Sequence, residues 1–355
     1  MGTTVRLCSC LALLGTFVIE DPFYCSEPPD HRQLAIAHLE QGNFDQALMS
    51  ARRATRQHRE DGSIFLIVAL AHLGRERADE AFAALAQAAI LEPENTQIHA
   101  TLRQIFGQEE RFDAAADVYE HLLERHPETA AGLVGLGWAL LRLGEEERGA
   151  ELLRRGIDAG DSTIFARVQL ARLYAGSDSL EQVTRMLSEA VEIDPDNLEL
   201  LLALGEYHLR SGDDAAAVEN LGRALQGSDQ PAKVATHIAQ LHYNLGSPRR
   251  AIEYYEKAIA IDPDQPMVLN NLAWTYAEEE LQIDRALELS LRSLKADADN
   301  VVYLDTYAEL LYKRGQHDRA IAMMRRALEI EPEDGEHYTY LREQLEKFQL
   351  ADSRL

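Results

Sequence analysis

Cysteine is almost absent from this sequence, and the few cysteines present are confined to one end. The chain of 355 residues has three, at Cys8, Cys10 and Cys25. Everything after Cys25 therefore lacks a thiol, which excludes a disulfide framework and a thiolate metal site from most of the protein. That region has to be stabilised by packing and hydrogen bonding instead.

Basic residues are also scarce. The sequence has 35 lysines and arginines against 60 aspartates and glutamates, which gives a formal net charge of −25. Affinity for a phosphate backbone comes from clustered lysine and arginine, so nucleic acid is not the expected partner. A basic peptide or the basic face of another protein would be attracted instead, although the same acidity also serves solubility. Charge alone does not choose between these two roles.

The short motifs that mark common catalytic and cofactor sites are missing. The sequence contains no GxxxxGK[ST] phosphate loop, no GxGxxG turn, no GxSxG elbow and no HExxH zinc motif. No segment alternates between apolar and polar residues for long enough to predict a strand. We therefore expect an all-α protein without a cofactor, a metal ion or catalysis.

A period of 34 residues dominates the chain. Pro93, Pro127, Pro195 and Pro263 are separated by 34 residues or by twice that number. Small residues recur in step with this period. The first series is Ala35, Ala69, Gly137, Ala171, Gly205, Ala239, Ala273 and Ala308, interrupted by Arg103, and two further series begin at Ala47 and Ala54. Self-similarity at a fixed spacing indicates stacked repeats, each of which buries its apolar face against its neighbours.

Each repeat carries the pattern of two helices. Apolar residues follow the i, i+3, i+4, i+7 spacing of one helix face, as in Leu269, Leu272, Ala273 and Tyr276. We expect the small residues where two helices cross closely. Glycine accepts the left-handed conformation that ends a helix, and five glycines stand where the first helix of a unit should end. These are Gly42, Gly144, Gly212, Gly246 and Gly315.

These landmarks resemble the tetratricopeptide repeat, a 34-residue helix–turn–helix. The resemblance is carried by the helix residues quoted above together with Ala286, and by Ala251, Tyr255, Ala258 and Pro263 one unit earlier. It implies a right-handed superhelical solenoid of about nine repeats with a C-terminal capping helix. The units are 28–61, 62–95, 96–129, 130–163, 164–197, 198–231, 232–265, 266–300 and 301–334. The eighth unit has one extra residue, expected at its inter-helix turn.

Four histidines share one position of the repeat, where the family pattern has tyrosine. They are His38, His72, His208 and His242. A metal site needs ligands that converge on one point, whereas these lie one or more repeats apart. We expect them to fill the space between the two helices of a unit.

The two ends differ from the array at 28–334. In the C-terminal segment, 335–355, an apolar stripe is expected to cover the last unit while the opposite face meets water. The stripe is Tyr338, Leu341, Leu345 and Phe348.

The N-terminal segment, 1–27, combines Arg6 with an apolar run from Leu7 to Ile19, which fits the apolar core of a secretory signal or a membrane tether. Glu20 and Asp21 follow at once, and a helix that caps the first repeat is the alternative. We expect a periplasmic, otherwise extracytoplasmic or membrane-tethered protein, with the cytoplasm as the alternative. Any membrane contact should pass through this segment only.

Partner-binding residues can be placed by helical phase. In members of the family, the second, fifth, ninth and twelfth positions of a unit line the concave groove that holds a ligand. The resemblance, extended by the neighbouring Asn271, implies these groove residues: Trp138, Arg172, Glu206, Gln240, Tyr243, Asn270, Asn271, Trp274, Asp305, Glu309 and Tyr312. Each tryptophan could either anchor a partner or pack sideways on the neighbouring unit.

Asn271 resembles the asparagines that clamp the backbone of an extended peptide. The carboxylate clamp of chaperone-binding members repeats lysine, asparagine and arginine across three units. This chain has His237, Asn271 and Thr306 at the matching positions, which argues against a terminal carboxylate as the ligand.

We predict a non-catalytic interaction scaffold that binds a protein or peptide in the concave groove. The first alternative is an envelope-tethered assembly subunit of the exopolysaccharide or protein export type, because the run at 270–274 and its counterpart at 303–306 resemble a pairing common in bacterial repeat proteins of this family. A remote alternative is an enzyme that uses groove histidines with Asp305 and Glu309. An open groove disfavours it, because it offers no water-excluded pocket.

Overall fold

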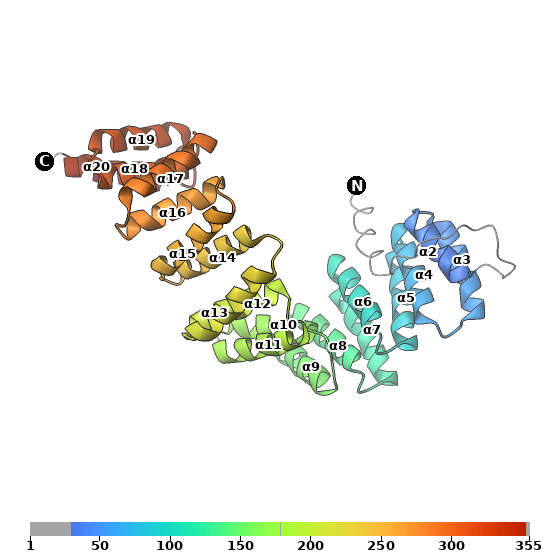
Figure 1. Cartoon of the computed structure of the whole chain (residues 1–355). Coiled ribbons are helices and arrows are strands. Elements are labelled where there is room, and N and C mark those ends of the chain that lie inside the picture. The colour runs from blue at the N-terminus through green and yellow to red at the C-terminus, as the bar shows by residue number, and fades with distance from the viewer. Residues whose placement is uncertain (1–29, 178, 353–355) are drawn as a thin grey trace. The chain divides into compact units, whose positions relative to one another are not determined.

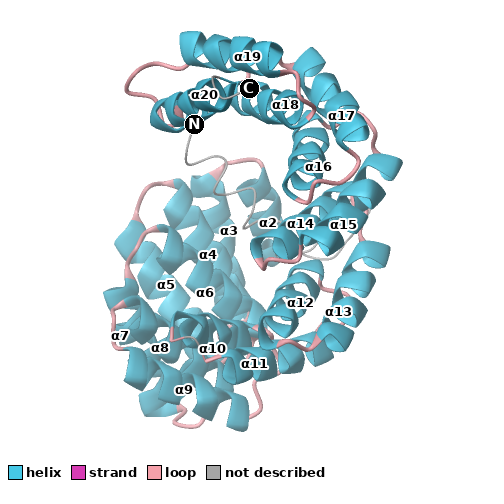
Figure 2. Ribbon diagram, turned by 90° about the vertical axis from the view of Figure 1, so that its left-hand side faces the viewer, coloured by secondary structure: helices cyan, strands magenta, loops and turns pink. Residues whose placement is uncertain are grey.

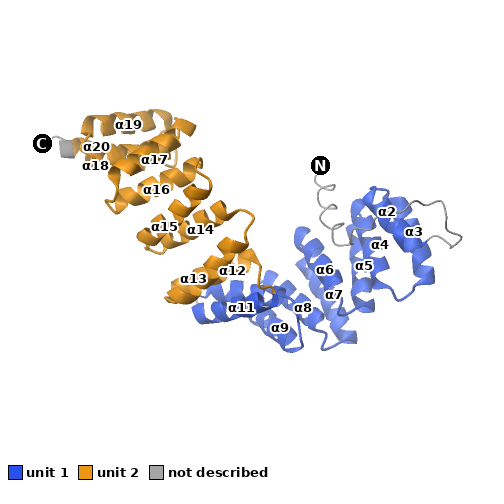
Figure 3. Cartoon of the chain, viewed as in Figure 1, with its two compact units in different colours: residues 1–193 blue, residues 194–355 orange. Residues whose placement is uncertain are grey.

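The computed structural model describes residues 30–177 and 179–352, and within these ranges every regular element is a helix (Figures 1 and 2). The chain divides into two compact units, residues 1–193 and 194–355 (Figure 3). The segment predicted to be a signal or anchor, 1–27, lies outside the described residues. Among the described helices, none has the length and apolar composition needed to cross a membrane.

The described part of the first unit contains α2 (His31–Glu40), α3 (Phe44–Gln57), α4 (Gly62–Gly74), α5 (Ala78–Leu91), α6 (Thr96–Gln108), α7 (Phe112–Arg125), α8 (Ala130–Arg142), α9 (Glu146–Asp158), α10 (Phe165–Gly176) and α11 (Leu180–Ile193). The described part of the second contains α12 (Leu198–Ser211), α13 (Asp214–Gly227), α14 (Pro231–Asn244), α15 (Pro248–Ile261), α16 (Pro266–Glu278), α17 (Ile283–Ala296), α18 (Val301–Lys313), α19 (His317–Ile330) and α20 (Tyr338–Asp352). Consecutive helices pack as pairs, α2 with α3, α4 with α5 and so on, with one pair to each 34-residue repeat. The helical hairpins predicted from the period are therefore confirmed.

The helices of a pair cross where the sequence has its small residues. A Cβ atom added to Gly137 of α8 would lie 2.8 Å from the carbonyl oxygen of Gly149 in α9, and one added to Gly149 would lie 2.8 Å from that of Gly137. Such distances leave no room for a methyl group, so the two backbones are in contact. Where Arg103 replaces the small residue, α6 and α7 pack less closely than α8 and α9, and its guanidinium lies over the ring of Phe165 at 4.0 Å.

The turn inside a repeat has a left-handed residue at the fifteenth position. The predicted glycines have φ between 72° and 85° there: Gly42, Gly144, Gly212, Gly246 and Gly315. In three other repeats the position is held by Glu76, Glu110 and Glu280, with φ of 60°, 53° and 53°. Since glutamate does not favour this conformation, the packing of the two helices imposes it. The extra residue of the eighth repeat lies in its turn, 279–282, as predicted.

Arginines of second helices bind the turn that leads into their own repeat. Nη2 of Arg223 donates to the carbonyl oxygen of Pro195 at 2.6 Å, and Nη2 of Arg292 donates to that of Pro263 at 2.5 Å. Each bond ties the end of a hairpin to its beginning across 28 or 29 residues. The repeat is thereby closed by a hydrogen bond as well as by apolar packing.

The last helix, α20, covers the open end of the array. Leu341 and Phe348 are buried, with 1% and 0% of their surface exposed, in a cluster with apolar residues of α18 and α19. The ring of Phe348 stacks on Tyr312 of α18 with 4.4 Å between the ring centres. The predicted apolar stripe therefore faces the last repeat, and α20 is the capping helix.

Candidate functional site

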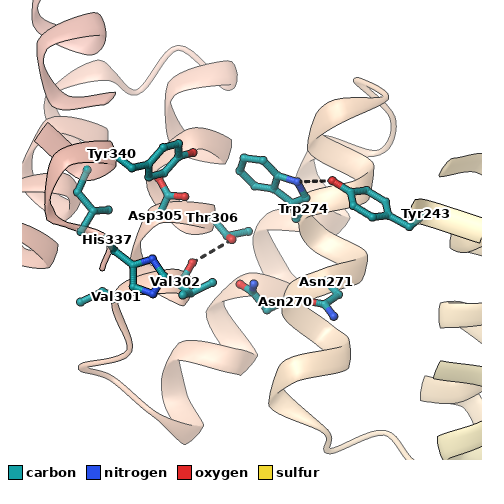
Figure 4. A pocket seen from close by; sticks show the side chains of 11 residues that line it. Tyr243, Asn270, Asn271, Trp274, Val301, Val302, Asp305, Thr306, His337 and Tyr340 are labelled. Atoms are coloured by element: carbon teal, nitrogen blue, oxygen red, sulfur yellow. Dashed lines mark hydrogen bonds between the residues drawn. The ribbon is translucent and has the colours of Figure 1, made fainter. Parts of the chain in front are cut away.

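A pocket of about 330 Å³ opens in the second unit between α16, α18 and the beginning of α20, with one residue from α14 at its edge (Figure 4). Its lining combines aromatic rings, aliphatic side chains and a few polar groups, as ligand sites commonly do. The lining residues are Tyr243, Asn270, Asn271, Trp274, Val301, Val302, Asp305, Thr306, His337, Tyr340 and Leu341.

The repeat period brings the polar residues of this pocket together. Asn270 and Asp305 occupy the fifth position of the eighth and ninth repeats, so stacked repeats present them on the same side. Asn271, Trp274 and Tyr243 were also predicted as groove residues, and all five line the pocket. Whether they bind a partner stays a prediction.

Trp274 is held in place by two hydrogen bonds in series. Its Nε1–H donates to the hydroxyl of Tyr243 at 3.0 Å, and that hydroxyl donates to Oε2 of Glu278 at 2.6 Å. Burial, together with the bond to the Glu278 carboxylate, raises the pKa of Tyr243. The indole is only partly buried, so it presents a fixed aromatic face to the pocket.

Asp305 is a carboxylate in a largely apolar place, with 9% of its surface exposed. Burial, reinforced by the nearby charge of Glu309, raises the pKa of Asp305 from 3.8 to about 6, against the opposing effects of a hydrogen bond from Tyr340 and of Lys347 and His337. Burial also raises the pKa of Tyr340. Asp305 thus changes charge near neutral pH.

Asn270 and Asn271 are neighbours with different surroundings. Asn270 is 3% exposed, and its Oδ1 is buried without a hydrogen-bond partner in the described part of the chain. A buried acceptor left unpaired costs about 1–3 kcal/mol. The side chain of Asn271, by contrast, is hydrogen bonded to Tyr255, a buried tyrosine whose pKa burial raises to about 12. Of these two asparagines, Asn270 is the one with a buried acceptor that has no hydrogen-bond partner among the described residues.

Trp138 lies in the core of the first unit. It is 7% exposed, and its ring contacts Phe112 edge-on, with 5.6 Å between the ring centres. A Cβ atom added to Gly107 would lie 3.5 Å from the indole, an ordinary van der Waals contact, so the ring packs directly against this position of the preceding repeat. The structure therefore has Trp138 packed sideways on the neighbouring repeat, the alternative to an exposed groove position.

The predicted groove residues of the ninth repeat are partly covered. Lys347 of α20 places Nζ 3.7 Å from Oε2 of Glu309, whose side chain is 15% exposed, and Phe348 stacks on Tyr312. The capping helix thus packs on Glu309 and Tyr312, which remain partly exposed, and their role in binding stays a prediction.

The remaining predicted groove residues lie outside the pocket. Arg172 is exposed on α10 in the first unit, whereas Glu206 of α12 and Gln240 of α14 are partly buried in the second. Their role in binding stays a prediction.

Half of the pocket was not anticipated from the sequence. Val302 is the second position of its repeat and so lies in the predicted phase. Val301 and Thr306 flank that phase on α18, and His337, Tyr340 and Leu341 come from the segment after the last repeat. No repeat position exists for that segment, so helical phase could not assign these residues. The available signal was the apolar stripe containing Leu341, which places the start of α20 beside α18.

The repeated histidines fill space between helices, as predicted. His242 is buried and stacks on Tyr254 with 5.5 Å between ring centres, and burial lowers the pKa of both His72 and His242. His38 and His208 are partly buried. Across the described ranges, no three His, Cys, Asp or Glu side chains converge in a way that could hold a metal ion.

Comparison with known proteins identifies the repeat. Family models described as tetratricopeptide repeat match residues 32–96, 104–162, 232–265, 254–288 and 301–341, more than half of the chain. The sequence is 23% identical over 214 residues to the DnaJ homolog subfamily C member 7 homolog of Schizosaccharomyces pombe, covering 56% of this chain and 44% of that protein. It is 21% identical over 226 residues to Protein O-mannosyl-transferase TMTC1 of Homo sapiens, covering 63% and 25%. The chain thus spans less than half the length of these relatives.

Solved structures of low sequence identity also match this chain. PilW, described as a widely conserved type IV pilus biogenesis factor, is 18% identical with a TM-score of 0.42, and the match covers 58% of this chain and 97% of that one. Yeast Tom70 is 12% identical with a TM-score of 0.40, and the match covers 91% and 89%. The 34-residue period, the helical hairpins and the family matches lead to the same conclusion: this chain belongs to the tetratricopeptide repeat family.

Proposed function

We propose that this protein is a non-catalytic scaffold that binds a peptide or protein partner, with the pocket between α16, α18 and α20 as the main contact. The observation that carries the proposal is the fixed, partly buried Trp274 beside the buried polar groups of Asn270 and Asp305. Tryptophans next to desolvated polar groups dominate the energy of many interfaces. Because Tyr243 and Glu278 already orient the indole, little side-chain freedom would be lost on binding.

The charge of the chain supports a basic partner. The formal net charge is −25, and an acidic surface attracts basic faces at long range and raises the rate of encounter. The pocket itself carries the carboxylate of Asp305. We therefore propose a partner segment that is basic where it meets this pocket.

The test is affinity capture with the full chain as bait, with bound proteins identified by mass spectrometry. Trp274→Ala combined with Asn271→Ala should weaken capture of a true partner about 30-fold or more, equivalent to about 2 kcal/mol. Val218→Ser is the matched control, because Val218 is an exposed apolar residue on α13 in the same unit. Equal capture by the folded double variant and the control would refute this site.

We also propose that the N-terminal segment directs export or tethers the array to a membrane, as an envelope assembly subunit would require. The supporting observation is Arg6 followed by the 13-residue apolar run from Leu7 to Ile19. Residues 1–30 fused to a reporter that is active only outside the cytoplasm should give activity. A silent reporter, with Met1 intact on the native soluble protein, would overturn the proposal in favour of a cytoplasmic array.

A further inference from the structure

The polar groups of the pocket include an acceptor that is not satisfied. Two of the donors are engaged within the protein: the indole N–H of Trp274 donates to the hydroxyl of Tyr243 at 3.0 Å, and the hydroxyl of Thr306 donates to the carbonyl oxygen of Val302 at 3.0 Å. Oδ1 of Asn270 lacks a donor within the described ranges. A donor brought by a ligand would satisfy this buried acceptor.

The pocket also has an unbalanced negative charge. Lys313 and Lys347 both pair with Glu309, at 3.9 Å and 3.7 Å, so Glu309 is compensated. Neither lysine lies within ion-pair distance of Asp305, and no other described cation does so, although Lys347 and His337 act on its charge from farther away. A buried carboxylate without an ion-pair partner is costly, and a cation bound beside it would recover that cost.

The walls of the pocket suit an alkyl chain. In Figure 4 the ring of Tyr340 lies over Asp305 on one side of the pocket and Trp274 lies on the other, with Thr306 below the space between the rings. Val302 and Leu341 add aliphatic surface. Aromatic faces also attract cations, which favours a positively charged group between them. A volume of about 330 Å³ admits one long side chain with room for water.

We propose that this pocket receives a lysine side chain of the bound partner, with its ammonium group between the carboxylate of Asp305 and Oδ1 of Asn270. This inference rests on the proposed function and gives the partner's chemistry. The aliphatic stem packs between Trp274 and Tyr340. An ammonium fits better than a guanidinium because the two acceptors come from different helices, α16 and α18. A guanidinium, by contrast, pairs best with the two oxygens of one carboxylate.

The test uses Nα-acetyl-lysine N-methylamide as the probe and the indole N–H signal of Trp274 as the readout. The Trp138→Phe background leaves Trp274 as the only tryptophan, so the signal reports on this pocket alone. Titration should shift it with a Kd of about 1 mM, as expected for a ligand of this size. Asp305→Asn and Asn270→Leu should each weaken binding about tenfold or more. Glu219→Gln, which removes an exposed charge on α13 in the same unit, is the control and should bind as the parent does.

Two analogues decide the chemistry. The Nε-acetylated probe has no charge and should not shift the signal, and the corresponding arginine derivative should bind more weakly than lysine. Equal binding of the acetylated probe, or tighter binding of arginine, would overturn the inference. So would full lysine binding by folded Asn270→Leu and Asp305→Asn variants.

The outcome can be separated from that of the proposed function. If the lysine probe fails while Trp274-dependent partner capture persists, the scaffold stands and the lysine assignment falls. If the probe binds but no partner depends on Trp274, the pocket chemistry stands and the scaffold proposal falls.

Discussion

Removing the charge of Asp305 should stabilise the folded protein at neutral and alkaline pH. The pKa of Asp305 rises from 3.8 to about 6 on folding because the carboxylate is buried beside Glu309. The difference between these values corresponds to about 3 kcal/mol. Above pH 6 the carboxylate is ionised in both states and the folded state bears this cost. As the pH falls from 6 toward 4 the group becomes protonated in the folded state, and the cost disappears.

Asp305→Asn tests this reasoning, because asparagine has nearly the same shape as aspartate and no charge. Urea unfolding followed by Trp274 fluorescence, in the Trp138→Phe background, reports on this end of the array. We expect the variant to be more stable at pH 8 by about 1–3 kcal/mol, with the difference nearly lost at pH 4. Asp334→Asn, in an exposed turn, should change little at either pH. A variant that is no more stable at pH 8, or equally stabilised at both values, would refute the argument from burial.

Three further predictions concern the fold. Glu110→Gly should stabilise the protein by about 0.5–1 kcal/mol in urea unfolding. Glycine adopts the left-handed backbone conformation without the steric strain of glutamate, and this gain exceeds the extra conformational entropy that glycine loses on folding. A loss of stability would contradict strain at this turn. Phe348→Ala should cost about 3–5 kcal/mol and speed hydrogen exchange in α18 and α19, whereas unchanged protection would show that α20 is not a cap. Gly137→Ala should destabilise by about 1–3 kcal/mol and Gly107→Ala by less than about 1 kcal/mol, and equal shifts in thermal melts would refute the close helix crossing.

Most of the fold could be predicted because every repeat has nearly the same pattern of small and apolar residues. A helix pair is specified by residues within one period, and its contacts are with the adjacent pairs, so no long-range pairing had to be guessed. The turns show a limit of predicting structure from residue type. Glycine predicted five of them, but Glu76, Glu110 and Glu280 take the same left-handed conformation without the residue that signals it. Position in the period, rather than residue type, is the more general predictor.

The two tryptophans show why the site was harder to predict. Trp138 and Trp274 share the ninth position, yet the first is buried and the second partly exposed. The twelfth position of the preceding repeat, 31 residues earlier, differs between them: Gly107 lies against the first ring, whereas Tyr243 is hydrogen bonded to the second. A single repeat does not contain this information. Two consecutive repeats do, and the pair of positions could be compared in any such array.

The contribution of α20 could not be read from helical phase at all. The sequence predicts that its apolar stripe covers the last repeat, and this is confirmed by Leu341 and Phe348. The stripe does not indicate that Tyr340, on another face, meets Asp305, or that Lys347 meets Glu309. These contacts depend on the position of α20 along the axis of α18, which is determined by side-chain packing.

The arginine bonds that close the hairpins have a consequence for changing the length of the chain. Arg292 reaches Pro263 across 29 residues, whereas Arg223 reaches Pro195 across 28, and the difference is the extra residue in the turn at 279–282. The longer turn leaves both the bond and the following helices in their usual places. A foreign loop, such as an affinity tag or a protease site, could therefore be inserted at this turn without shifting the register of the repeats beyond it.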